Sequence, residues 1–233
     1  MCVRLIKLNL IKFSTKYNGS NCLRFPKMQK LLIATTNPWK IQMFKKISQN
    51  FEGKLDLVFL DSLEKVPVPE ENGKTVEENA IIKAKYYGDV FKMPTVADDW
   101  SFAIDELNGE PWVMTRRWWG ILPDWISDED WSDFYMKRVA KIWKDIFGAR
   151  LIYCRCLYIP ETKEIFLDSG NNPMFLTKNP YPLKVGWFPL NSFIVLADWK
   201  YEIEVPEEEK MILQAKRRDY NWFLEMIEKH FFK

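Results

Sequence analysis

Three carboxylates and a lysine with the spacing of a metal and polyphosphate site lie between residues 75 and 99. Glu78 and Lys83 fall in the first turns of a predicted helix, and Asp98 and Asp99 follow the next short apolar run. Adjacent carboxylates repel each other, so at least one is expected to have a raised pKa unless a cation lies beside it. Carboxylate oxygens bind divalent metals, and a lysine supplies fixed positive charge to phosphate oxygens. The segment therefore predicts a site for a divalent metal and a polyphosphate.

The helix that carries Glu78 also offers this glutamate a purely structural use. Thr75 and Glu78 have the spacing of a capping box, in which the glutamate binds the backbone amide of the N-cap residue. Asn79 and Lys83 are four residues apart and lie on one face of the helix. Capping and metal binding are both open for Glu78 at this level.

A phosphate site is also predicted where the first strand, residues 29–35, turns into a helix over residues 39–49. Asn37 is a favourable N-cap, and Pro38 occupies the first helical position. Backbone N–H groups at the start of a helix are free to bind a phosphate. Lys40 falls in the first turn, where a positive charge is unfavourable to the helix dipole unless a bound anion offsets it. An ordinary surface lysine is the alternative interpretation.

The remaining elements are predicted from hydrophobic alternation and turn residues. Strands are expected over residues 55–60, 95–97, 150–159 and 163–167, with the last two paired across an E-T-K turn. The two aspartates are expected at the carboxyl end of the short strand 95–97. An amphipathic helix is predicted over residues 128–147, a loop over residues 170–183, and a terminal helix from the acidic segment 204–210 to about Phe231.

Length and composition suit one sizeable α/β domain, or two lobes that share a core. The chain has 233 residues, of which 47% are hydrophobic, and its formal net charge is +2. No apolar run approaches the ~20 residues of a transmembrane helix. Interspersed charges near balance are a poor fit to a nucleic-acid-binding surface. We therefore expect neither a membrane nor a nucleic-acid partner.

The cysteines and the single histidine make a structural zinc site a poor fit to this sequence. Cys154 and Cys156 are two residues apart in an apolar run, so their thiols are expected on one face of a strand. Buried free thiols in a reducing compartment are the expected state. His230 is the only histidine and falls in the final turn of the last predicted helix. Ser–His or Cys–His catalysis would have to use this one residue.

The first 27 residues differ in composition from the rest of the chain. They contain six basic residues and no acidic one. We expect residues 1–27 to be a poorly ordered extension and residues 28–233 to be the folded domain. The extension is compatible with an organellar transit peptide or with a translated upstream stretch in which Met28 is the working start. A cytoplasmic location is expected, with an organellar one as the alternative.

Tryptophan is concentrated in the middle of the chain, where residues 100–143 hold seven of the eleven. Those in the predicted helix 128–147 are expected in the core. Trp118 and Trp119 follow two arginines and have three possible uses, namely stacking a base, lining a partner interface or covering the sheet.

Three segments, in the same order, resemble the motifs of the inosine triphosphate pyrophosphatase family, enzymes that remove deaminated purine nucleotides. The first is a strand-to-helix turn with a lysine, the second a helix start with a lysine, and the third a pair of aspartates with a following arginine. They are Ile33–Asn37 with Lys40, Glu77–Ala80 with Lys83 and Ala84, and Ala97–Asp99 with Gly109–Pro111 and Arg117. The resemblance covers roughly residues 30–120 and is looser beyond them.

The resemblance implies an elongated two-lobed α/β fold, with a mixed β-sheet, flanking helices and a central cleft, and usually a homodimer. It implies Mg²⁺-dependent hydrolysis of a nucleoside triphosphate to the monophosphate and pyrophosphate. Matched by motif, the metal ligands would be Glu78, Asp98 and Asp99, and the catalytic residues would be Asp99, Glu78 and Lys83. Substrate-binding residues in the matching motifs would be Thr35, Asn37, Lys40, Asn79 and Arg117.

The chain departs from the family where the base is recognised. Phe188 stands in place of an aspartate, and residues 214–216, Gln-Ala-Lys, stand in place of Ser-His-Arg. Trp100 replaces a small serine after the paired aspartates. The base contacts in this chain are therefore predicted to come from Trp100, Trp187, Phe188, Gln214 and Lys216.

Two functions are compatible with this combination of retained and altered motifs. The first is a nucleoside triphosphate pyrophosphatase with altered or relaxed base specificity, because polar contacts determine base identity more sharply than stacking does. The alternative is a catalytically inactive protein on the same fold that binds a nucleotide or a protein partner. Retention of the carboxylates favours the active enzyme.

Overall fold

The computed structural model of the protein describes residues 29–51, 54–123, 125–182, 189–206, 209 and 221–231. Within these residues, the helices are α1 (Pro38–Ser48), α2 (Val76–Phe91), α3 (Asp128–Val139) and α5 (Asn221–Phe231). The strands are β1 (Gln29–Ile33), β2 (Leu55–Phe59), β3 (Thr95–Ile104), β4 (Pro111–Trp112), β5 (Ile146–Ile159), β6 (Glu164–Thr177) and β7 (Ile194–Val195).

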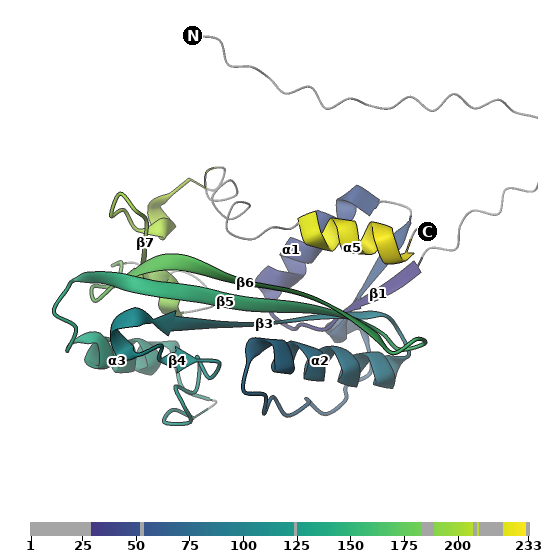
Figure 1. The fold of residues 1–233 in the computed structure, drawn as a ribbon, viewed down its shortest axis with the longest axis horizontal. Helices are drawn as coiled ribbons and strands as arrows, with labels where there is room; N and C mark the ends of the chain where they lie inside the picture. The colour runs from purple at the N-terminus through teal and green to yellow at the C-terminus, as the bar shows by residue number, and fades with distance from the viewer. Residues whose placement is uncertain are drawn as a thin grey trace, which may run out of the picture.

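These strands form one mixed sheet, in which the order is β2–β1–β3–β5–β6–β7 and β4 pairs with β3. β1 is parallel to both β2 and β3, and every other pairing is antiparallel. β5 and β6 are 14 residues long and pair along their whole length, so they form a long ribbon through the molecule. Figure 1 shows α1 and α5 on one side of this ribbon, α2 on the other, and α3 at the end far from β1. The prediction of a mixed α/β fold with flanking helices is confirmed.

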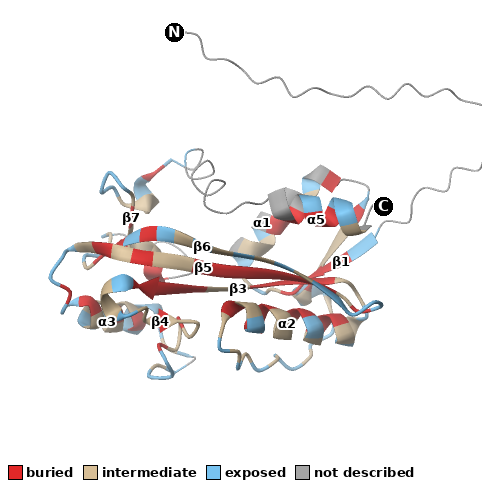
Figure 2. Ribbon diagram, viewed as in Figure 1, coloured by how far each residue is buried: buried red, intermediate tan, exposed pale blue. Residues whose placement is uncertain are grey.

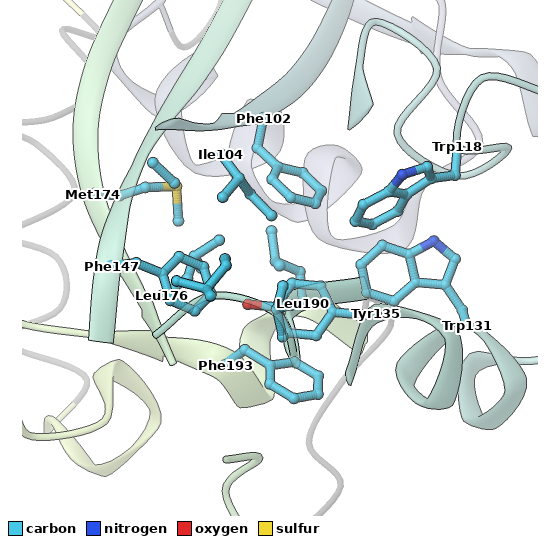
Figure 3. Packing of buried hydrophobic residues seen from close by; sticks show 13 residues of the cluster. Phe102, Ile104, Trp118, Trp131, Tyr135, Phe147, Met174, Leu176, Leu190 and Phe193 are labelled. Atoms are coloured by element: carbon cyan, nitrogen blue, oxygen red, sulfur yellow. The ribbon is translucent and has the colours of Figure 1, made fainter. Parts of the chain in front are cut away.

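Two hydrophobic cores lie toward opposite ends of the long strands. The α3 core packs aromatic side chains of α3 and of the loop after β4 against β3, β5 and β6 (Figure 3). Trp118, Trp131 and Tyr135 are fully buried there, and the rings of Trp131 and Tyr135 stack with centroids 5.7 Å apart. The α1–α5 core contains Leu31, Phe44, Val96, Phe223 and Ile227.

Side chains of β3 alternate between the two faces of the sheet, and on one face Asp98 and Trp100 lie between the two cores. Val96 belongs to the α1–α5 core, whereas Phe102 and Ile104 belong to the α3 core. These three positions are even-numbered and point to one face of the strand. Asp98 and Trp100 occupy the even positions between them, so the apolar surface is interrupted there.

The opposite face of the central strands packs under α2 and forms a third core. Ala80 and Ala84 of α2 lie against Ala97 of β3 and the thiols of β5, and Figure 2 shows most of β3 and the second half of β5 as buried. Cys154 and Cys156 are buried and free, as predicted. Burial raises the pKa of each thiol to about 12, so both act as small apolar side chains.

The predicted helix over residues 128–147 is too long. α3 ends at Val139, and β5 begins at Ile146. Trp143, which the helix would have carried into the core, is 85% exposed. Burial of Phe147 and Ala149, on either side of the less buried Gly148, follows the two-residue period of a strand. Long-range pairing with β6 therefore determines the structure of this segment.

Two predicted strand boundaries are also wrong, because both strands continue through polar residues. β3 extends past the aspartates to Ile104, so Asp98 and Asp99 lie in the strand rather than at its end. β6 includes residues 170–177, which had been predicted as a loop. Pro173 is tolerated because, in this part of β6, the described pairing is with β5 on one edge.

The other predicted elements from residue 29 to the β5–β6 turn agree with the structure to within a residue or two at most ends. α5 confirms the end of the predicted terminal helix. The predicted extension 1–27 lies outside the described residues, as do residues 183–188 and 210–220. Among the described residues, no helix is long and apolar enough to cross a membrane.

Candidate functional site

Lys83 joins two carboxylates on the α2 face of the sheet. Its Nζ lies 3.1 Å from Oδ1 of Asp99 and 3.1 Å from Oε2 of Glu71. The amide of Asn79 donates to Oδ2 of Asp99 at 3.2 Å. Because Asn79 and Lys83 are one turn apart on α2, the helix presents both donors to the same aspartate.

The loop before α2 is fixed by side chains of the helix's first turns. Oδ1 of Asn79 accepts a hydrogen bond from the backbone N–H of Gly73 at 2.8 Å, which leaves its amide nitrogen directed to Asp99. A Cβ on Gly73 would lie 2.6 Å from this oxygen, so the close approach requires glycine. These contacts hold the loop that carries Glu71 next to Lys83.

Glu78 takes part in the capping of α2. Oγ1 of Thr75 accepts from the backbone N–H of Glu78 at 3.2 Å, as expected of an N-cap. The carboxylate of Glu78 accepts from the N–H of Lys74 at 2.6 Å, one residue before the amide that a capping box would use. Its side chain is exposed. Of the two uses predicted for Glu78, the described contacts are those of a capping residue.

A second lysine–aspartate pair lies on the opposite face of β3. Nζ of Lys40 is 2.7 Å from Oδ2 of Asp98, and both side chains are largely buried. The indole N–H of Trp100 donates to the same carboxylate oxygen, and Nζ of Lys40 lies 5.5 Å from the centre of the Trp100 ring. Asp98 is therefore shared between a cation and an indole, on the polar interruption between the two cores.

Lys40 lies in the first turn of α1, as predicted, and the helix start directs it to Asp98. Oδ1 of Asn37 accepts from the N–H of Lys40 at 3.4 Å, and the N–H of Asn37 contacts Oγ1 of Thr35 at 3.2 Å. Asn37 thus caps α1, as predicted, and Lys40 in the first turn contacts Asp98. Thr35 and Asn37 are only partly buried, so their polar groups remain accessible at the helix start.

Both lysine–aspartate pairs adjoin one unpaired stretch of strand edge. On that edge, β1 pairs with Thr95 and Val96, and β4 pairs with Phe102 and Ala103. None of the described strands pairs with β3 between these contacts, whereas the other edge is paired with β5 throughout. Asp98 and Asp99 point to opposite faces of the strand but flank the same opening in its pairing. The two pairs therefore lie on either side of one stretch of strand edge.

The ionisable groups have opposite pKa shifts on the two faces. Burial would raise the pKa of Asp98, but Lys40 and Lys83 outweigh it and lower that pKa below its ordinary value. Burial raises the pKa of Asp99, and Lys83 only partly offsets it while Glu71 adds to it. Burial would lower the pKa of Lys83, but Asp99 and Glu71 raise it, so the lysine stays protonated. The ammonium of Lys83 therefore keeps its charge at neutral pH between Asp99 and Glu71.

The expected metal-ligand set of Glu78, Asp98 and Asp99 is not assembled. No group of three His, Cys, Asp or Glu side chains suited to a metal was found within the described part of the chain. The reason is geometric, because the two aspartates occupy opposite faces and Glu78 is engaged by the loop backbone. Asp99 and Glu71 instead surround one cation, the ammonium of Lys83.

Glu71 is the site residue that the sequence reasoning missed. It lies in the polar loop before α2, twelve positions from the lysine that it contacts. No helical or strand periodicity connects a loop residue to a helix residue at that distance. Only the fold of the loop over the helix start brings the two together.

The predicted base-contact residues are only partly described. Trp100 packs against Tyr153 with ring centroids 5.7 Å apart, and Arg155 lies 4.8 Å above the Tyr153 ring and 2.9 Å from Asp168. Trp187, Phe188, Gln214 and Lys216 lie outside the described residues. Arg117 lies in the loop after β4, next to the buried Trp118, and its carbonyl accepts from Leu122. Its role in substrate binding stays a prediction.

Comparison with known proteins relates this geometry to a family. Residues 31–178 match the model of the Ham1 family. A dITP/XTP pyrophosphatase of Symbiobacterium thermophilum is 30% identical over 190 residues, which cover 82% of this chain and 90% of the relative. A dITP/XTP pyrophosphatase of Streptomyces coelicolor is 32% identical over 137 residues, which cover 59% of this chain and 67% of the relative.

A solved structure has the same fold over nearly its whole length. The crystal structure of a nucleoside-triphosphatase, dITP/XTP pyrophosphatase, from Mycobacterium abscessus superposes with a TM-score of 0.66 at 25% identity. The match covers 85% of this chain and 100% of that structure. The family match over residues 31–178 includes both lysine–aspartate pairs and the loop that holds Glu71.

Proposed function

Since this chain belongs to the Ham1 family, we propose that it hydrolyses a nucleoside triphosphate to the monophosphate and pyrophosphate. The observation that supports this most directly is the pair of lysine–aspartate contacts at one unpaired edge of β3. The relatives of this chain are pyrophosphatases for dITP and XTP. The predicted membership of the inosine triphosphate pyrophosphatase family agrees with both comparisons.

When the triphosphate binds, its phosphate oxygens replace the aspartate oxygens as the partners of the two lysines. The ammonium groups of Lys40 and Lys83 are held near the strand edge by Asp98 and Asp99. A triphosphate brings phosphate oxygens to the same positions, so the lysines stay neutralised when the ligand binds. Thr35 and Asn37 add polar contacts, and the start of α1 adds backbone N–H groups with a favourable dipole.

Mg²⁺ fits the carboxylates that surround Lys83, although not the set first predicted. Magnesium in phosphate-transfer sites is typically held by one or two carboxylates together with waters and substrate phosphates. Asp99 and Glu71 would hold it, because both already face one positive charge at 3.1 Å. When bound, the ion would neutralise phosphate charge and make an attacking water more acidic.

The residues of the chain then orient the reaction at the phosphorus nearest the sugar. Water adds to this α-phosphorus, the bond to the bridging oxygen of the β-phosphate breaks, and pyrophosphate leaves with that oxygen. Asp99 is the catalytic carboxylate that we assign to orienting the water, because Lys83 and Asn79 hold its two oxygens at the unpaired edge of β3. Lys83 stays protonated and stabilises the charge on the leaving pyrophosphate.

The base is recognised differently from the purines of the family, in our proposal. Trp100 occupies the Asp98 face of the site and stacks obliquely on Tyr153. A large indole fixed by Asp98 and Lys40 favours recognition by stacking over recognition by hydrogen bonds. We expect a relaxed or altered specificity, in which Trp187, Phe188, Gln214 and Lys216 complete the base site.

Pyrophosphate release tests the activity and the substrate together. Purified protein is assayed with Mg²⁺ against standard, deaminated and modified nucleoside triphosphates. Asp99→Asn should abolish release, whereas Asp89→Asn, a carboxylate of α2 that pairs with Lys163, should not. Chelation of the metal should stop release, and added Mg²⁺ should restore it. No release from any nucleotide would overturn the proposed activity, and a strong preference for ITP would overturn the altered specificity.

A partner-binding protein on the same fold is the second candidate, and exposed aromatic residues favour it. Trp119 is 53% exposed and Trp125 is 86% exposed, both in the loop between β4 and α3. A homodimer, which we also propose, would have apolar surface available here. Sedimentation of wild type and of Trp125→Ser tests the dimer, since a dimer at this loop should dissociate in the variant.

A further inference from the structure

A pocket of about 370 Å³ lies on the α2 face, separate from the contacts of Lys83. Its floor is the cross-strand row formed by Ser101 of β3, Ile152 of β5 and Asn171 of β6. Its walls come from the first residues of α2, from Trp112 of β4 and from Ser169 of β6. The volume is within the range of small-molecule sites, roughly 300–1,000 Å³.

The hydroxyl of Ser101 is the feature that points to a ligand. Ser101 is 3% exposed, and its Oγ has no hydrogen-bond partner among the described residues. A buried polar group without a partner costs about 1–3 kcal/mol, so native proteins rarely keep one without a reason. Because Ser101 lines the pocket, a bound molecule can supply the missing partner.

The lining determines the chemistry of that molecule. Among the described residues, no lysine or arginine lines the pocket, and Glu77 at the start of α2 would repel an anion. Trp112 offers an aromatic wall, Ile152 offers an apolar floor, and the hydroxyls and the amide of Asn171 offer donors and acceptors. An uncharged planar ring with hydrogen-bonding edges satisfies all of these groups, whereas a phosphate does not.

Trp112 is held in place at the edge of this pocket. Its indole N–H donates to the carbonyl of Lys74 at 3.3 Å, which ties β4 to the loop before α2. Its backbone has φ of +52°, a conformation that a bulky residue rarely adopts. The aromatic wall is therefore fixed relative to the same loop that holds Glu71.

The pocket is adjacent to the phosphate site along one strand. Ser101 and Asp99 are two residues apart on β3 and point to the same face, which places them about 7 Å apart. Cys154 and Ser169 form the next cross-strand row, opposite Asp99. A ring in the pocket would thus lie within one nucleotide's length of Lys83.

We propose that this pocket binds a nucleobase ring, in uncharged form, against Trp112 and Ser101. The lining alone indicates a planar uncharged ring. The narrower assignment to a nucleobase depends on the proposed function. The ring is that of a separate nucleoside, because the base of the triphosphate is assigned to the Trp100 face of the site. The base of the substrate would have the same chemistry, and turnover measurements distinguish the two sources.

Titration calorimetry with uncharged nucleosides tests the proposal without turnover. The probes are inosine, adenosine, guanosine, cytidine, uridine and thymidine, with inorganic tripolyphosphate as the probe of the phosphate site. Asn171→Ala removes polar contacts at an exposed position, and Ser169→Phe fills the pocket from its exposed rim. Asn172→Ala is the matched control, because this asparagine is next in β6 and faces the opposite side.

We expect the wild type to bind at least one nucleoside. Asn171→Ala should bind that nucleoside about tenfold more weakly, and Ser169→Phe should not bind it at all. Asn172→Ala should match the wild type, and tripolyphosphate should bind every variant equally. If Ser169→Phe also raises KM for pyrophosphate release at unchanged kcat, the ring is that of the substrate. If it leaves KM unchanged, the ring is that of a separate nucleoside.

Two results would overturn the assignment, namely no nucleoside binding by the wild type or equal binding by wild type and Ser169→Phe. Failure of the proposed function looks different, because nucleoside binding would then persist in a protein that releases no pyrophosphate.

Discussion

Glu71 is the acidic side chain whose position changes the expected chemistry most. It shares the ammonium of Lys83 with Asp99, and all three side chains are at least partly buried. We expect Glu71→Gln to lower kcat/KM for pyrophosphate release by about 100-fold, because one of two charges around the cation is lost. The substitution keeps the shape and hydrogen-bonding capacity of the side chain, so folding should be preserved.

Glu64→Gln is the matched control, since Glu64 is an exposed residue of the same loop. The two variants are compared by pyrophosphate release over a range of Mg²⁺ concentrations. A role in metal binding predicts that high Mg²⁺ partly rescues Glu71→Gln. Equal activity of both variants would exclude Glu71 from the site.

Glu110 ties the turn before β4 to α3, far from the two lysine–aspartate pairs. It accepts from the indole N–H of Trp118 at 3.0 Å and from Nε and Nη2 of Arg138 at 2.8 and 2.7 Å. Burial would raise the pKa of Glu110, but these hydrogen bonds outweigh it and lower the pKa below its ordinary value of 4.5. The folded protein therefore binds this proton less tightly than the unfolded chain does.

The lowered pKa gives the contribution of Glu110 a defined pH dependence. It stabilises the fold fully above the unfolded pKa and is lost as pH falls through the lower folded pKa. Urea unfolding should show Glu110→Gln less stable than wild type by about 1 kcal/mol near neutral pH, after allowance for partial exposure. The difference should vanish in acid, while Glu161→Gln in the exposed β5–β6 turn should behave as wild type throughout. A difference that persists at all pH values would exclude the charge as its cause.

Gly170 allows β6 to pass under the ring of Tyr153. A Cβ at this position would lie 2.5 Å from that ring, which is nearly fully buried. Gly170→Ala should displace Tyr153 and with it the support of Trp100, and should cost about 1–3 kcal/mol of folding free energy. Thermal unfolding measures this, with Asn172→Ala on the same strand as control. Unchanged stability would mean that the strands separate there at no cost.

The elements that sequence predicts well are those whose signals are local. Asn37 and Thr75 cap their helices within three residues, and both helix starts agree with the structure. The first part of β5 and the second half of β6 depend on each other, across register pairs such as Ile146 with Thr177. No short window contains both partners, so an exposed alternating strand that includes a proline was predicted as a loop.

The candidate site divides in the same way. Lys40, Lys83, Asp98 and Asp99 are each predicted as site residues from motifs that lie within one or two neighbouring elements, whereas the pairing of each lysine with one aspartate follows only from the fold. The two aspartates point to opposite faces because β3 continues through both of them, and the predicted strand, which ends at Ala97, does not include them. Glu71 and the Ser101 pocket depend on how loops and strands far apart in sequence meet, which neither composition nor spacing contains.

At the scale of the whole molecule, the long ribbon of β3, β5 and β6 places the site between two independent cores. The α3 core and the α1–α5 core meet β3 on either side of Asp98 and Trp100. Polar residues can remain in the middle of the strand because each core is complete without them. The unpaired edge between β1 and β4 then opens both faces of one strand to one ligand.

If a single triphosphate spans that edge, the two lysines must act on the same ligand although they lie on opposite faces. We expect Lys40→Met and Lys83→Met each to weaken tripolyphosphate binding by at least about tenfold. In the double variant the second substitution should cost less than it does alone, because the first already releases the ligand from the shared edge. The coupling energy should exceed about 0.5 kcal/mol, the usual limit for independent sites. As a control, the effects of Lys163→Met, on the β5–β6 turn, and Lys40→Met on the binding free energy should be additive. If the effects of Lys40→Met and Lys83→Met are additive as well, the two faces of β3 bind separately.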